Sequence, residues 1–234
     1  MKTSEIATAL VTAGLALVAG MARADDAAPA RPAAPAPAPP WQLSLGVRDS
    51  AFRDAGYDPF STNDAFVQAS VSGTRAFPTG GPLTPALGLS WETGQTDAAA
   101  RGGQAHLRLS RLAAVVEGRL AVDPLPLSLF LRLSPGLLQG TASLDDRSAP
   151  ALLSATFSRL SLDASLGAVA ALSPRGKPVV LLGIAEGGYG WSPRQSLTLR
   201  PALATADQAK GGSTSLGSLA ARGAFLRLSA GLAF

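Results

Sequence analysis

Apolar residues recur at every second position along most of the chain. The pattern begins with Trp41, Leu43, Leu45 and Val47 and is still present in the last residues before Phe234. Successive side chains of a β-strand point to opposite faces, so a period of two predicts strands rather than helices. The segments that carry the pattern span residues 41–50, 64–77, 84–96, 104–121, 125–143, 153–172, 178–200 and 218–234.

The connections between these segments are alternately short and long. Proline and glycine, which favour tight turns, punctuate the short connections at 78–82, 122–124 and 173–177. The longer and more polar connections lie at 49–63, 93–103, 143–150 and 201–215. Transmembrane barrels have short turns on one side and longer loops on the other. The sequence therefore predicts an all-β fold: an eight-stranded antiparallel up-and-down transmembrane β-barrel with both ends on the periplasmic side.

The composition fits a chain that is not surrounded by water alone. Hydrophobic residues make up 47% of the chain and charged residues only 15%, an unusual balance for a water-soluble domain. The absence of cysteine excludes a disulfide framework and a cysteine zinc site. A net charge of +4 without a Lys/Arg run gives no sign of nucleic-acid binding. No phosphate loop or metal-ligand spacing is present, so we expect no cofactor.

The N-terminal residues have the composition of an export signal and a tether. Residues 1–24 combine Lys2, an apolar stretch and the small residues Ala22 and Ala24 around Arg23, which is typical of a cleaved signal peptide. Residues 25–40 contain mainly proline and alanine, which favour an extended linker. The barrel is then expected to span residues 41–234.

The chain resembles the small eight-stranded outer-membrane β-barrels of Gram-negative bacteria. The resemblance covers residues 41–234 and includes an alternating last segment that ends in an aromatic residue. It implies a location in the outer membrane, contact with outer-membrane lipid, and recognition of Leu228, Leu232 and Phe234 by the outer-membrane assembly machinery. Such barrels carry aromatic girdles at the membrane interfaces, which here would consist of Trp41, Trp91, Tyr189 and Trp191.

The polar face of the predicted strands carries both signs of charge. It contains Arg48, Glu92, Arg108, Glu117, Arg119, Arg132, Asp163, Glu186 and Arg227. Side chains fill the interior of an eight-stranded barrel, so we predict a charge network that plugs the lumen. Because the five arginines outnumber the four carboxylates, a narrow anion-favouring pore is the alternative.

Three segments change the parity of their apolar positions midway. The changes lie near Arg111, Pro135 and Arg159, and a β-bulge at each would restore the facing of the side chains. Pro135 and Pro193 also stand where a regular ladder would lack a hydrogen-bond donor. We therefore expect irregular pairing at these places.

The sequence favours a non-enzymatic barrel with a structural or surface-interaction role. If Leu107 and Leu109 face lipid, His106 and Ser110 face inward, where a hydrolase triad that also uses Glu92 would not reach membrane lipid. The mixed residues of the 49–63 connection are suited to binding a surface sugar or protein. Two further alternatives are a lipid-modifying barrel enzyme and a soluble periplasmic barrel that binds an apolar ligand, with its leucines facing inward.

Overall fold

The computed structural model describes residues 40–52, 54–79, 82–100, 103–122, 125–146, 152–173, 178–201 and 213–234. The predicted signal peptide and all of the predicted linker except Pro40 lie outside these residues. No helix in the described part is long and apolar enough to cross a membrane.

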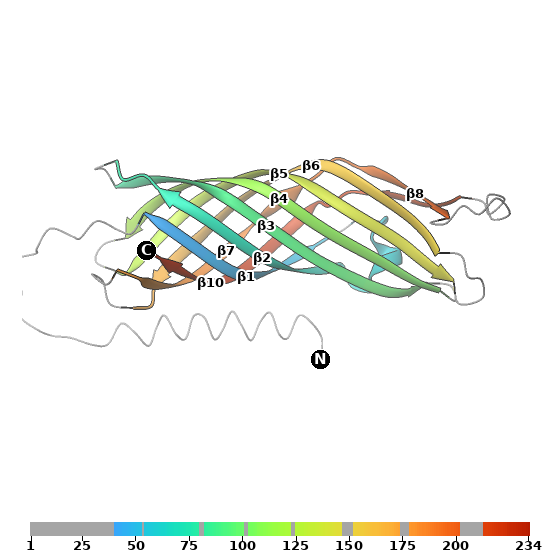
Figure 1. Cartoon of the computed structure of the whole chain (residues 1–234), viewed down its shortest axis with the longest axis horizontal. Coiled ribbons are helices and arrows are strands. Elements are labelled where there is room, and N and C mark those ends of the chain that lie inside the picture. The colour runs from blue at the N-terminus through green and yellow to red at the C-terminus, as the bar shows by residue number, and fades with distance from the viewer. Residues whose placement is uncertain are drawn as a thin grey trace, which may run out of the picture. The chain divides into compact units, whose positions relative to one another are not determined.

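The described chain forms a closed antiparallel barrel (Figure 1). Its strands are β1 (Trp41–Ala51), β2 (Ala65–Ala76), β3 (Leu83–Ala100), β4 (Gly103–Val122), β5 (Leu127–Asp146), β6 (Leu152–Ala171), β7 (Val180–Trp191), β8 (Gln195–Pro201), β9 (Thr214–Leu219) and β10 (Gly223–Ala233). The ladder runs from β1 through β2, β3, β4, β5, β6, β7 and β10, and β10 pairs with β1. The predicted eight-stranded antiparallel barrel is confirmed.

The two ends of the barrel differ. Residues 41 and 233 and the last residues of β2, β4 and β6 lie at one end of the barrel, which we call the turn end. The opposite end, which we call the loop end, carries the 3-10 helix η1 (Asp58–Phe60) and β8. The long connection predicted at 93–103 is wrong: β3 and β4 pair up to Ala100 and Gly103.

The seventh and eighth predicted strands are each broken in two. β7 ends at Trp191 and β8 begins at Gln195, because Pro193 between them has no N–H for the ladder. Even-numbered side chains of β7 face the interior, whereas odd-numbered ones of β8 do so. β8 pairs with β9 but with β6 at only two positions, Leu153 and Ser154.

The three bulges predicted near Arg111, Pro135 and Arg159 are wrong, but the β4–β5 ladder is interrupted beside Pro135, between the pairs Ala113–Gly136 and Val116–Leu133, without a change of register. The pairing of β3 with β4 runs without a shift from Leu83 to Ala100, and that of β5 with β6 from Leu127 to Asp145. Odd-numbered side chains of β4 face inward along its length, from Ala105 through Arg111 to Glu117. The chemistry of each face changes along the strand, while the direction of the side chains does not.

Both faces of the wall change polarity at the same level. On the turn-end half, the outer face carries the apolar band, a set of exposed large apolar side chains. The band comprises Trp41, Leu43, Leu45, Val47, Val67, Leu83, Leu87, Leu89, Trp91, Leu112, Val116, Leu120, Leu129, Leu131, Leu133, Leu137, Leu160, Leu162, Leu166, Leu181, Tyr189, Trp191, Leu232 and Phe234. On β3–β6, the edge of the band nearer the loop end is one row of paired residues: Trp91, Leu112, Leu137 and Leu160.

Beyond that row the outer face becomes polar. The polar outward-facing residues of β3–β6 in the loop-end half are Thr93, Gln95, Asp97, Gln104, His106, Arg108, Ser110, Gln139, Thr141, Ser143, Asp145, Ser154, Thr156 and Ser158. We call this set the outer polar face. From Ser110 to Gly103 it extends on the order of 20 Å along the barrel axis, for a rise of about 3.3 Å per residue and a tilt of about 40°.

The interior of the loop-end half is apolar. A buried cluster there contains Phe52, Tyr57, Phe60, Phe66, Ala105, Leu107, Leu109, Leu138, Ala142, Leu197, Leu199 and Leu219. A smaller cluster at the turn end contains Phe130, Val169, Val180, Leu182, Ile184 and Ala233. Between the two clusters the interior is polar and charged. The outer face is therefore apolar around this charged interior and the small cluster, and polar around the large apolar cluster.

The connection that contains η1 folds into the barrel. Phe52 stacks on Phe66 with ring centroids 5.5 Å apart, and Tyr57 meets Phe52 edge to face at 5.3 Å. The Tyr57 hydroxyl donates to the carbonyl oxygen of Ala65 at 2.9 Å, and burial raises the pKa of this hydroxyl above its ordinary value. Tyr57 and Phe60 are buried, so they cannot form the exposed recognition loop expected at 49–63.

Candidate functional site: the charged lumen and the outer wall

A chain of ion pairs crosses the polar middle of the interior. At one end, Arg119 Nη2 lies 2.7 Å from Glu117 Oε2, and Glu117 Oε1 lies 2.5 Å from Arg132 Nη2. Arg132 Nη1 lies 2.6 Å from Glu186 Oε2, which is 2.9 Å from Arg227 Nη1. These contacts join the side chains of β4, β5, β7 and β10 across the lumen.

The other half of the chain centres on Glu92, which is fully buried. Glu92 contacts Arg227, and its Oε2 accepts a hydrogen bond from Arg48 Nη1 at 2.8 Å. Asp163 Oδ2 lies 2.5 Å from Arg48 Nη1 and 2.9 Å from Arg111 Nη1. Arg111 also approaches Glu92 at 3.6 Å. One continuous network therefore links five arginines to four carboxylates.

Hydroxyl and aromatic groups support the network. Arg48 donates to Ser50 at 3.0 Å, Arg111 donates to Ser161 at 2.9 Å, and Ser165 donates to Glu186 at 2.6 Å. The Arg48 guanidinium lies 3.9 Å from the centre of the Phe225 ring. Buried charges need such partners, because an unpaired charge is strongly disfavoured away from water. The arrangement fills the bore of the barrel, which eight strands leave just wide enough for side chains.

Eight of the nine residues predicted for the lumen face the interior, and Arg108 does not. Arg108 is exposed on the outer polar face because β4 keeps its register through this region. Arg111, which the sequence suggests only as a point of phase change, takes its place in the network. A constant parity along β4 places Arg111 with Glu117 and Arg119, and this signal would have found it.

The residues considered for catalysis do not meet. His106 Nδ1 lies 2.5 Å from Asp97 Oδ1 on the outer wall, and Ser110 hydrogen-bonds Thr93 at 3.0 Å. Glu92 is buried on the other side of the wall. The expectation that His106 and Ser110 face inward is wrong, because Leu107 and Leu109 occupy the interior positions. Within the described residues, no group of three or more His, Asp or Glu could hold a metal ion.

The predicted girdle residues all belong to the apolar band. Trp41 lies at the turn end, where the Arg75 guanidinium is 5.3 Å from its ring. At the opposite limit of the band, the guanidinium of Arg222 lies 5.4 Å from the ring of Trp191. Trp91 and Tyr189 are exposed on the same outer surface.

The residues predicted to form the assembly signal lie on β10 and just after it. The backbone of Phe234 exchanges hydrogen bonds with Trp41 at 2.9 and 3.0 Å, which closes the barrel at its turn end. Leu232 and Phe234 point outward and are exposed, and Leu228 is half-buried. Their recognition by an assembly machinery stays a prediction.

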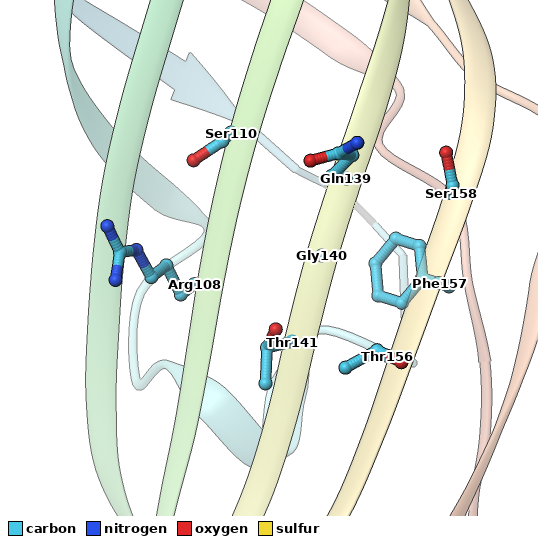
Figure 2. A pocket seen from close by; sticks show the side chains of 8 residues that line it. All are labelled: Arg108, Ser110, Gln139, Gly140, Thr141, Thr156, Phe157 and Ser158. Carbon is cyan, nitrogen blue, oxygen red and sulfur yellow. The ribbon is translucent and has the colours of Figure 1, made fainter.

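A depression of about 500 Å³ lies in the outer polar face (Figure 2). Its outward-facing lining consists of Arg108, Ser110, Gln139, Thr141, Thr156 and Ser158, from β4, β5 and β6. Gly140 and Phe157, whose positions face inward, complete the lining. A Cβ on Gly140 would overlap the Phe157 ring, so the absence of a side chain there lets the ring pack against β5.

Comparison with known proteins gives structural similarity alone. No protein-family model and no curated protein matches the sequence. The solved structure of Neisserial surface protein A (NspA) is similar over 82% of this chain and 94% of that one, with 12% identity and a TM-score of 0.44. The attachment invasion locus protein Ail of Yersinia pestis is similar over 84% of this chain and 99% of that one, with 14% identity and a TM-score of 0.45. A structure of Ail in complex with the heparin analogue sucrose octasulfate is also similar, with a TM-score of 0.44.

Proposed function

We propose that this chain is a non-enzymatic outer-membrane barrel whose lumen is plugged and whose loop-end half projects from the membrane as an interaction surface. The observation that carries the proposal is the simultaneous change of polarity on both faces of the wall. A segment in lipid needs an apolar outer face, whereas a segment in water needs an apolar interior and a polar outer face. The turn-end half meets the first requirement, and the loop-end half meets the second.

Closure of the sheet is the second support for this location. Lipid offers no hydrogen bonds to backbone groups, so a strand protein can span a bilayer only when no sheet edge is exposed to lipid. Around the apolar band every strand is paired with both neighbours, including β1 with β10, and the β4–β5 ladder is interrupted only beside Pro135. The expectation of a soluble barrel fits this half poorly, because a belt of exposed leucines would favour association in water.

Membrane fractionation tests the location. The mature protein is expected in the outer-membrane fraction, to resist extraction by alkaline carbonate, and to change its gel mobility when boiled after folding in detergent. Recovery without detergent in the soluble periplasmic fraction would contradict the proposal. A periplasmic soluble protein and a known outer-membrane protein from the same cells serve as controls for the separation.

Planar bilayers test the plugged lumen. Insertion of the folded protein is expected to give no stepwise ion conductance, because the charge network and the apolar cluster behind it fill the bore. Gel-shift analysis of the same bilayer preparation controls for insertion. Reproducible anion-selective steps that disappear in an Arg132→Gln variant would instead support the pore.

A further inference from the structure

The depression in the outer polar face lies directly above the apolar band. Ser110, Gln139 and Ser158 form one row of paired residues across β4, β5 and β6. Two residues nearer the turn end on each strand, Leu112, Leu137 and Leu160 form the last row of the apolar band. Leu160 is the most exposed large apolar side chain in the described part of the chain, at 72%. A polar hollow and an apolar strip are therefore continuous on one surface.

The charge available in the depression is positive. Arg108 faces Gln95 across the ladder on β3 and Thr141 on β5, and both are uncharged. The nearby carboxylate of Asp97 is engaged by His106 at 2.5 Å. Figure 2 shows Arg108 at one edge of the depression, with its guanidinium extending toward β3 and the polar groups of Gln139, Thr141, Thr156 and Ser158 on its other side. Guanidinium groups bind phosphate through paired, charge-assisted hydrogen bonds.

The size of the depression favours a ligand that is larger than a bare phosphate. A volume of about 500 Å³ lies within the range of sites that hold small organic molecules. Four hydroxyl groups and the Gln139 amide line it together with Arg108, and such groups can hydrogen-bond a polyhydroxylated headgroup. The adjoining leucine row can accept acyl chains, which places headgroup and chains of one amphiphile on the same wall.

From this juxtaposition we infer that the outer wall of β4–β6 holds one phosphorylated glycolipid. Its phosphate contacts Arg108, its sugar lies among Ser110, Gln139, Thr141, Thr156 and Ser158, and its chains lie along Leu112, Leu137 and Leu160. The inference rests on the proposed membrane location, because only a bilayer presents an amphiphile at this level. The loop end of the barrel then faces the leaflet in which this glycolipid resides.

Native mass spectrometry of the detergent-folded, full-length mature protein tests the site with lipid A, which carries two phosphates. One molecule is expected to bind the unmodified protein, and Arg108→Gln is expected to weaken binding at least tenfold. Arg194→Gln removes another exposed positive charge, at the β7–β8 break and 3.8 Å from Asp54, and is the control, with binding unchanged. Thr141→Trp, which fills the depression from an exposed position, is expected to weaken binding without removing a charge.

Two comparison lipids decide the chemistry. Dephosphorylated lipid A and phosphatidylglycerol are each expected to bind at least tenfold more weakly than lipid A. Equal binding of phosphatidylglycerol, or equal weakening by Arg108→Gln and Arg194→Gln, would overturn the glycolipid site while the membrane barrel stands. Failure of the protein to fractionate with the outer membrane would instead overturn the proposed location, whichever lipid binds in detergent.

Discussion

Replacement of Glu92 by leucine is expected to lower the free energy of unfolding by about 3–5 kcal/mol. Glu92 is fully buried and lies between the guanidinium groups of Arg48, Arg111 and Arg227. The substitution leaves these cations with Asp163 and Glu186 as their remaining anionic partners, at a place that water does not reach. Urea unfolding of the protein in detergent micelles, followed by tryptophan fluorescence, measures the loss.

Two further variants separate a charge effect from a general packing effect. Asp97→Leu makes the same kind of change in the exposed pair with His106, and its expected cost is below about 1 kcal/mol. The double variant Glu92→Leu/Arg227→Leu restores the original excess of one positive charge in the network, so it is expected to regain part of the loss. A cost for Glu92→Leu as small as that for Asp97→Leu would show that the network does not hold the barrel together.

The alternation of the sequence determines which residues share a face, but it does not determine which face points inward. The surroundings of the wall decide that, and under the proposed location they change along these strands from lipid to water. Leu107 and Leu109 have the same spacing as the leucines of the apolar band, so their alternation alone predicts that they face lipid. They instead lie inside with Arg111. The apparent changes of phase in the sequence mark the level at which the outer face changes from apolar to polar.

Two other errors have the same origin. The polar composition of residues 93–103 predicts a loop, but residues 93–100 and 103 belong to paired strands, because the outer face of the wall is polar in this half of the barrel. The charged network was largely predictable, because in that half of the barrel the alternation matches that of a membrane strand. The break at Pro193 was predictable as an irregularity, whereas the change of facing between β7 and β8 was not visible in the residues alone.

The residue types that fill the interior follow from the change in polarity of the outer face between the two halves of the barrel. In the turn-end half most leucines point outward, so the inward positions between the two apolar clusters are left to small, polar and charged residues that must satisfy one another. In the loop-end half the inward positions of β4 and β5 carry leucine and alanine, and they need further apolar side chains to complete a core. The chain supplies these from the connection between β1 and β2, which brings Tyr57 and Phe60 inside.

Replacement of Phe60 by alanine is therefore expected to cost about 3–5 kcal/mol, as for a large aromatic residue in a packed core. Its ring is fully buried, and the carbonyl oxygen of Phe60 accepts a hydrogen bond from Thr96 at 3.1 Å, which fixes η1 against β3. Asp58→Ala alters an exposed residue of the same short helix and is expected to change stability by no more than about 0.5 kcal/mol. Urea unfolding compares the two variants.

Limited proteolysis distinguishes a core residue from a residue of a projecting loop. In the unmodified protein the connection between β1 and β2 is expected to resist cleavage, because Tyr57 and Phe60 anchor it inside the barrel. Phe60→Ala is expected to expose this connection to chymotrypsin at Tyr57, while Asp58→Ala leaves it protected. The opposite result is that both variants have the same stability in urea and the same cleavage pattern as the unmodified protein. In that case the connection projects outward, and the loop-end half needs another core.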